Sequence, residues 1–116
     1  MKRGDIYWAN IAPRSGSEQT GRRPVIILSH DAFNGTPSWR SIIVIPVSTS
    51  PTQARRGPTI VTLHAGTANL KSDSSAICHQ ITTLDRAKLV EKIGTIPTDI
   101  LAQVEKALLA AIDIRH

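Results

Sequence analysis

The sequence predicts a mainly β protein, in which short strands form a small twisted barrel and one C-terminal α-helix packs against it. Three observations support this fold class. Short apolar or alternating segments rich in β-branched residues recur along the chain before residue 97. Turn-forming residues separate these segments. The only sustained helical periodicity follows Thr98. Many short strands followed by one helix are typical of a small barrel with a helix packed against it.

The strands are expected in the following order. Asp5–Ile11 alternates in polarity and contains Ile, Tyr and Trp, and residues 24–29 form a continuous apolar run typical of a fully buried strand. Residues 41–47 are β-branched at nearly every position. Pro46 lies among them and cannot donate a ladder hydrogen bond, so it is expected at an edge or a bulge. Further strands are expected at residues 59–63, 75–82 and 91–96.

Two polar connections and a helix complete the predicted fold. Residues 30–40 and 48–58 are rich in turn-forming residues. Asp85 is expected to cap one helical turn over residues 85–89. Thr98 is expected to be the N-cap of the final helix, and Asp99 favours its first turn. The apolar residues of this helix form an amphipathic stripe, namely Ile100, Leu101, Val104, Leu108, Leu109 and Ile112.

Length and composition indicate one globular domain over residues 1–116. Hydrophobic residues make up 41% and charged residues 20% of the chain, which is ordinary for a soluble protein. The single cysteine excludes an internal disulfide and fits a reducing compartment. There is no apolar run of transmembrane length and no signal peptide, so a cytoplasmic protein without membrane contact is expected.

The charge of the chain favours a polyanionic partner. The formal net charge is +5, and a basic balance on a small domain points to nucleic acid first. Basic residues occur in adjacent pairs at residues 2–3, 22–23 and 55–56, in stretches expected to be loops or strand edges. This arrangement predicts a basic face.

Neither a metal nor a nucleotide cofactor is expected. The possible ligands His30, His64, Cys78, His79 and His116 lack the spacing of known metal sites. In the predicted strand, Cys78 and His79 point to opposite faces, which also argues against a Cys–His nucleophile pair and favours a core position for Cys78. No phosphate-binding loop or dinucleotide fingerprint is present.

A set of charged and polar side chains lies at the ends of three predicted strands. They are Glu18, Arg22, Arg23, Ser48, Thr49, His79 and Gln80. Such ends can converge on one rim of a small barrel. An arginine can hold a phosphate and stabilise transition-state charge, a hydroxyl can donate a hydrogen bond, and Glu18 can act as a base. Each residue also has an ordinary interpretation, Ser48 as a turn residue and His79 as a strand histidine.

Three segments carry a resemblance to a known family. They are Arg-Gly-Asp-Ile-Tyr-Trp at residues 3–8, the Gly-Ser-Glu-Gln block that leads into Arg-Pro at residues 16–28, and residues 76–85. With these segments the chain resembles the MazF/PemK/Kid toxins of bacterial toxin–antitoxin systems over almost its full length. The resemblance implies an SH3-like barrel with added helices. It also implies a sequence-specific, ribosome-independent endoribonuclease of the mRNA interferase type.

The resemblance assigns roles to individual residues. Arg23, directly before Pro24, is similar to the family's catalytic arginine. The second catalytic position is usually a threonine in a Pro-x-Thr context. Here Pro46 is followed by Ser48 at that position and by Thr49, so either hydroxyl is a candidate. Glu18 resembles an acidic residue implicated in some members. The expected RNA contacts are Ser17, Gln19, Arg22, Arg55, Arg56, His79 and Gln80.

The expected reaction is metal-independent cleavage of single-stranded mRNA. The 2′-OH attacks the phosphodiester and leaves a 2′,3′-cyclic phosphate, or its 3′-phosphate product, and a 5′-OH end. Arg23 is expected to stabilise the phosphorane because arginine stays protonated near neutral pH, which leaves proton transfer to Glu18 or His79. The resemblance implies a homodimer and a MazE-like acidic antitoxin. Trp39 is expected either to stack on a base or to plug the end of the barrel.

Two alternatives remain open from the sequence. The same barrel resembles the CcdB gyrase poisons, which bind a protein and do not cut RNA. A relative that binds RNA without cutting it is also compatible with serine at position 48.

Overall fold

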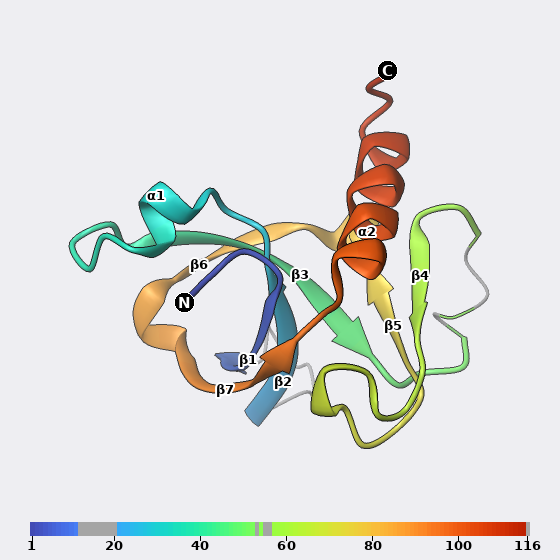
Figure 1. Ribbon diagram of the computed structural model, residues 1–116, viewed down its shortest axis with the longest axis horizontal. Helices are drawn as coiled ribbons and strands as arrows, with labels where there is room; N and C mark the ends of the chain where they lie inside the picture. Colours follow the sequence, from blue (N-terminus) through green and yellow to red (C-terminus); the bar gives the residue numbers. More distant parts are fainter. Residues whose placement is uncertain (12–20, 53, 55–56, 116) are drawn as a thin grey trace, which may run out of the picture.

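The computed structural model describes residues 1–11, 21–52, 54 and 57–115. It is mainly antiparallel β-sheet with a C-terminal helix, as predicted (Figure 1). The strands are β1 (Asp5–Ile11), β2 (Gly21–Ile27), β3 (Ser41–Ser48), β4 (Ile60–Leu63), β5 (Ser74–Ile77), β6 (Thr82–Asp85) and β7 (Leu89–Thr95). The helices are α1 (Asp31–Asn34) and α2 (Thr98–Ala111), with 3₁₀ turns η2 (Thr67–Asn69), η3 (Cys78–Gln80) and η4 (Arg86–Lys88).

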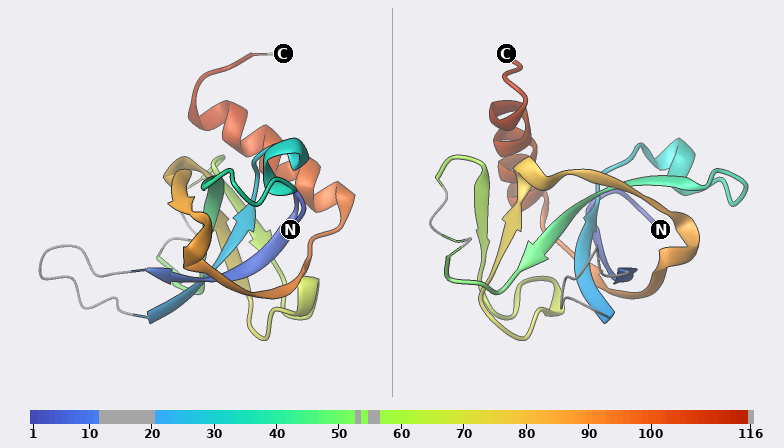
Figure 2. Two further views of the ribbon diagram at one scale, coloured as in Figure 1. Left: turned by 90° about the vertical axis from the view of Figure 1, so that its left-hand side faces the viewer. Right: turned by 180° about the vertical axis from the view of Figure 1, so that it is seen from behind.

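The strands lie in the order β4-β5-β3-β2-β1-β7, and β6 also pairs with β3. Strands β1, β3, β4 and β7 lie within two residues of their predicted bounds. Figure 2 shows α2 lying over one side of the curved sheet, while the ends of β1 and β2 project away from it. None of the helices in the described ranges is long and apolar enough to cross a membrane.

The central strands β2 and β3 are buried on both faces over residues 25–27 and 44–45. Val25 and Ile27 of β2 belong to an inner cluster with Ala9, whereas Ile26 faces a second cluster beneath α2, which we call the helix-side cluster. Because successive residues of a strand point to opposite faces, a strand covered on both sides must be apolar throughout. The continuous apolar run therefore correctly predicted a buried strand.

Pro46 lies in the central strand β3 and not at an edge of the sheet, but at a position where no ladder hydrogen bond is needed, as predicted. The partner on one side of β3 changes at this point. β6 pairs with residues 41–44 and β5 with residues 47–48, so Pro46 falls where neither pairing reaches. The missing N–H of proline is tolerated because β3 has no ladder partner on that side at this position, while Pro46 lies opposite Val25 of β2 on the other side.

The predicted strand over residues 75–82 is wrong, because η3 interrupts it. Between the pairs Val47↔Ala76 and Val44↔Thr82, β3 advances by three residues and the facing chain by six. The three extra residues leave the sheet as the turn Cys78–Gln80. This excursion depends on the register against β3, which is 30 residues distant in sequence and invisible in the local pattern.

Helix α2 packs on the helix-side cluster as predicted. Val104 is fully buried and Asp99 lies in the first turn. Partly buried residues of the predicted stripe also contact the cluster, namely Ile100, Leu101 and Leu108. Two details differ from the prediction. Pro97 has the extended backbone of an N-cap, so Thr98 is the first helical residue, and Ile112 lies past the helix end with 50% of its surface exposed. Asp85 caps η4 as predicted, accepting the N–H of Ala87.

Gly94 of β7 allows a close approach of η2. A Cβ at Gly94 would lie 2.3 Å from the backbone oxygen of Ala68, which itself has a left-handed backbone (φ 49°). Gly94→Ala should therefore lower the free energy of unfolding by about 1–3 kcal/mol, because the backbone at Ala68 must move away from the new methyl group. Urea unfolding checks this against Val90→Ala, an exposed position on the same strand that should cost much less. Equal stability of the two variants would disprove the steric argument.

Candidate active site

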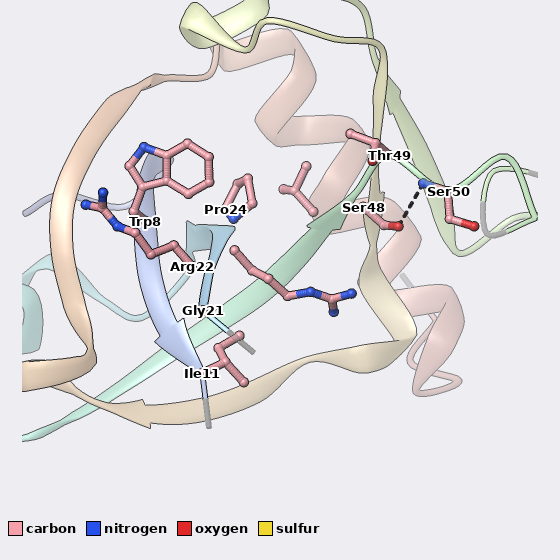
Figure 3. A pocket seen from close by; sticks show the side chains of 10 residues that line it. Trp8, Ile11, Gly21, Arg22, Pro24, Ser48, Thr49 and Ser50 are labelled. Atoms are coloured by element: carbon pink, nitrogen blue, oxygen red, sulfur yellow. Dashed lines mark hydrogen bonds between the residues drawn. The ribbon is translucent and has the colours of Figure 1, made fainter. Parts of the chain in front are cut away.

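A cleft of about 410 Å³ opens where β1 and β3 end and β2 begins (Figure 3). Trp8 and Ile11 of β1 form one side, residues 21–24 of β2 form the floor, and residues 47–50 at the exit of β3 form the opposite side. The cleft therefore brings together two arginines and three hydroxyl side chains from segments far apart in the sequence.

Arg22 and Arg23 lie within strand β2, and their predicted place in the loop before it is wrong. β2 begins at Gly21 because β1 extends to Ile11 and pairs with these residues, Ala9 with Arg23 and Asn10 with Arg22. The pairing of β2 with β3 includes only residues 25–27, so residues 21–24 pair with β1 alone. The arginines are thus mounted on regular backbone and face opposite sides of it.

Arg22 is held against one wall of the cleft. Its Nη2 donates a hydrogen bond of 2.9 Å to Glu91 Oε1, and its guanidinium carbon lies 5.7 Å from the ring centroid of Trp8 (Figure 3). Both charged side chains of this ion pair are about half exposed or more, so it contributes at most about 1 kcal/mol. Its main effect is to orient the arginine over the indole.

Arg23 is partly buried and lies on the same face of β2 as Val25, which belongs to the inner cluster. It lines the first cleft and also a second cleft of about 610 Å³. Gln80, Thr82 and Thr83 line this second cleft. Arg23 therefore lies where two clefts meet, with a guanidinium that can contact ligands in both.

Ser48 and Thr49 lie at the exit of β3 and both line the first cleft. Ser48 is partly buried and its Oγ accepts the N–H of Ser50 at 3.0 Å (Figure 3). This is the turn interaction expected of such a serine, and it leaves the hydroxyl hydrogen of Ser48 as a donor. Thr49 is exposed. The hydroxyl of Ser48 is thus oriented by the backbone.

His79 and Gln80 are neighbours on the turn η3, but their side chains lie in different surroundings. Gln80 reaches the second cleft beside Arg23, whereas His79 is not among the residues that line either cleft. The Nδ1 of His79 lies 2.7 Å from Thr59 Oγ1. The predicted strand histidine is therefore an exposed histidine on a 3₁₀ turn.

Cys78 is a core residue, as predicted. It is fully buried in the helix-side cluster, and burial raises the pKa of its thiol to about 11. The thiol is therefore neutral and unreactive at physiological pH. The strand predicted through Cys78 and His79 is wrong because this segment is a turn, yet the turn still separates buried Cys78 from exposed His79.

Five predicted site residues lie outside the described residues, namely Ser17, Glu18, Gln19, Arg55 and Arg56. Within the described ranges, no three His, Cys, Asp or Glu side chains are grouped as metal ligands. Trp8 and Thr82 line the clefts but were not among the predicted site residues. Trp8 shares its strand face with buried Ile6 and exposed Asn10, so no local pattern distinguishes it from a core residue.

Comparisons with known proteins agree with one another. The family model of PemK-like, MazF-like toxins of type II toxin–antitoxin systems matches residues 2–112. Endoribonuclease MazF6 of Mycobacterium tuberculosis and endoribonuclease MazF2 of Mycobacterium bovis are each 32% identical over 114 residues, covering 98% of either chain. Among solved structures, a MazE–MazF crystal structure from Deinococcus radiodurans has a TM-score of 0.77 at 29% identity, covering 99% of this chain and 97% of that one.

A second solved structure supports the fold alone. A mycobacterial endoribonuclease in complex with its cognate antitoxin has a TM-score of 0.80 at 19% identity. It covers 100% of this chain and 98% of that chain.

Proposed function

The chain belongs to the PemK-like, MazF-like toxin family of type II toxin–antitoxin systems, and on that basis we propose that it is an endoribonuclease that cuts single-stranded mRNA. Two relatives of nearly full-length overlap are named endoribonucleases, which favours RNA cleavage over gyrase poisoning. The observation that carries the proposal is the shared cleft of Arg23 and Ser48 at the ends of β2 and β3. The chain acts as a single toxin domain in the cytoplasm, where mRNA is available.

The main requirement of the proposed reaction is that the negative charge on the phosphorane oxygens be stabilised. The 2′ oxygen forms a bond to phosphorus while the bond from phosphorus to the 5′ oxygen breaks. One proton leaves the 2′-OH and one reaches the departing 5′ oxygen. Arg23 offers a guanidinium fork to the phosphorane oxygens, on which negative charge develops. The hydroxyl of Ser48 or Thr49 adds a further hydrogen bond from the opposite side of the cleft.

Proton transfer is assigned to Glu18 rather than to His79. His79 is directed to Thr59 and does not line the cleft that contains Arg23 and Ser48. The sequence places Glu18 three residues before Gly21, which does line that cleft. A carboxylate can take the proton of the 2′-OH and return it to the leaving oxygen.

The two clefts together provide the RNA-binding surface. Because they meet at Arg23, nucleotides on both sides of the scissile phosphate can be held, one side beside Arg22 and the other beside Gln80. The remaining proposed contacts come from Ser17, Gln19, Arg55 and Arg56. His79 contributes at the outer margin of this surface.

Cleavage should not require a divalent ion. The purified protein should cut a long single-stranded RNA in excess EDTA, because the positive charge opposite the phosphorane comes from Arg23. The measurement compares fragment formation with EDTA and with added Mg²⁺. A strict requirement for Mg²⁺ in the chemical step would contradict the proposal, and binding without cutting would identify an RNA-binding relative.

We propose an acidic, MazE-like antitoxin as partner. The net charge of +5 and the arginines at the clefts favour a partly disordered acidic segment that orders on binding and carries apolar anchors. A MazF of 29% identity has been solved with its MazE. Association should slow markedly as salt rises, because charge steers the encounter. Co-expression with the neighbouring upstream reading frame should abolish growth arrest. An unchanged arrest would contradict this pairing.

We also propose that the toxin is a homodimer. A domain of this size offers limited surface for several nucleotides, and two copies extend it. Sedimentation of the toxin alone should show a dimer at micromolar concentration. The same run serves as the reference for the antitoxin complex. A monomer would contradict the proposal.

A further inference from the structure

An aromatic pair is exposed on residues 31–40, the connection that includes α1 and leads into β3. The rings of Phe33 and Trp39 stack with centroids 4.5 Å apart and an interplanar angle of 26°. Phe33 is 43% exposed and Trp39 is 44% exposed, so Trp39 does not plug the barrel. The stacked rings therefore leave part of their aromatic surface open to solvent, and the ring of His30 packs edge-on against Phe33 with centroids 6.2 Å apart.

The pair is held rigidly by Arg86 of η4. The guanidinium of Arg86 donates hydrogen bonds of 2.8–3.0 Å to four carbonyl oxygens of this connection, those of Phe33, Asn34, Thr36 and Trp39. The indole Nε1 of Trp39 donates a further hydrogen bond of 2.7 Å to the carbonyl of Ser41. A ring fixed in this way loses little conformational entropy when a ligand stacks on it.

The charge around the pair suits a polyanion. The four acceptors of Arg86 are neutral carbonyls, so they leave its positive charge uncompensated. Lys88 follows on the same turn, while Arg40 is paired with Asp85 at 2.9 Å.

Strand β6 connects the pair to the catalytic clefts. Thr82 and Thr83 of β6 line the second cleft beside Arg23, and β6 ends at Asp85, directly before Arg86. Figure 1 shows β6 running beside β3 toward α1. The four residues of β6 span roughly 13 Å. An RNA strand that leaves Arg23 along β6 therefore reaches the aromatic pair within a few nucleotides.

We propose that Phe33 and Trp39 form a stacking platform for one unpaired base of the RNA substrate, outside the clefts in which the RNA is cleaved. This inference rests on the proposed ribonuclease function and adds a binding subsite to it. Stacking on aromatic side chains is the sequence-tolerant way to hold single-stranded nucleic acid. The platform therefore raises affinity for longer RNA and leaves the choice of cleavage site to the clefts.

Two matched substitutions of Trp39 test the platform. Trp39→Leu and Trp39→Phe both remove the hydrogen bond to Ser41, but only phenylalanine keeps an aromatic face. Binding is measured with uncleavable 2′-O-methyl oligonucleotides of about four and about twelve nucleotides, spanning the usual range of small single-strand sites. Trp39→Leu should weaken binding of the longer oligonucleotide by about tenfold, the size typical of one lost stack. Trp39→Phe should stay close to the wild type, and the shorter oligonucleotide should bind all three proteins alike.

Thermal unfolding checks that the variants are folded. If Trp39→Leu does not fold, Phe33→Leu decides, because it leaves the bond between Trp39 and Ser41 in place and should also weaken binding of the longer oligonucleotide. Suppose that the wild type binds and cuts RNA. If Trp39→Leu then binds the longer oligonucleotide as tightly as the wild type, the platform is overturned. A changed sedimentation coefficient with unchanged RNA affinity would overturn it in favour of a surface between copies. A wild type that neither binds nor cuts RNA would overturn the proposed function as well.

Discussion

Replacing Arg23 with alanine should slow RNA cleavage by about 10²- to 10³-fold, the usual cost of losing one donor that stabilises transition-state charge. Arg23 is the arginine that lines both clefts, and it extends from regular backbone paired with Ala9. The substitution leaves this pairing intact, so the loss should appear in kcat more than in KM. Single-turnover cleavage of a short fluorogenic RNA measures it.

Arg22→Ala is the matched control for this variant. It removes the same charge one residue away, from an arginine already bonded to Glu91, and should mainly weaken RNA binding. Arg23→Lys keeps the charge without the bidentate fork and should fall between alanine and the wild type. The assignment fails if Arg23→Ala cuts at a nearly normal rate, if it is unfolded, or if Arg22→Ala loses as much kcat.

The second large effect is expected at Ser48. Ser48→Ala should reduce the cleavage rate on the order of 10²-fold, because its partly buried hydroxyl is oriented in the cleft by the N–H of Ser50. Thr49→Ala should have a much smaller effect, since that side chain is exposed. Ser48→Thr restores a hydroxyl and should retain most of the activity. The same single-turnover assay ranks the three variants.

The opposite ranking would identify Thr49 as the working hydroxyl. Ser48→Ala also removes the acceptor for the Ser50 N–H, at a cost of about 1 kcal/mol in stability. Thermal unfolding of each variant therefore accompanies the rates. A loss of rate in Ser48→Ala that Ser48→Thr does not rescue would point to this structural bond instead of to catalysis.

The parts of the fold that were predictable are those decided by local pattern. Residues 24–27 are apolar throughout because Val25 and Ile26 face two different buried clusters, and this leaves a clear pattern in the sequence. The start of β2 at Gly21 was not predictable, since its first residues are polar and are strand only through pairing with β1. The turn at η3 was missed because the register against β3 creates it.

The site was predictable in its chemistry and less so in its geometry. Arg23 and Ser48 could be selected from their places at strand ends and from the family resemblance, and the structure puts them in one cleft. The contact of Arg22 with Glu91 joins residues on β2 and β7, which meet only through β1, so no local pattern could show it. His79 was grouped with the site from its place on a predicted strand and from the family resemblance, whereas it lies on η3 with its Nδ1 2.7 Å from Thr59 Oγ1.

The central claim is that the cleft containing Arg23 and Ser48 cuts RNA by attack of the neighbouring 2′-OH. Its most direct test is end-group analysis of the fragments formed from a long single-stranded RNA in excess EDTA. We expect 5′-hydroxyl ends paired with 2′,3′-cyclic phosphate or 3′-phosphate ends, and resistance at a site carrying 2′-deoxyribose. Fragments with 5′-phosphate and 3′-hydroxyl ends, or normal cutting at the 2′-deoxy site, would contradict the account.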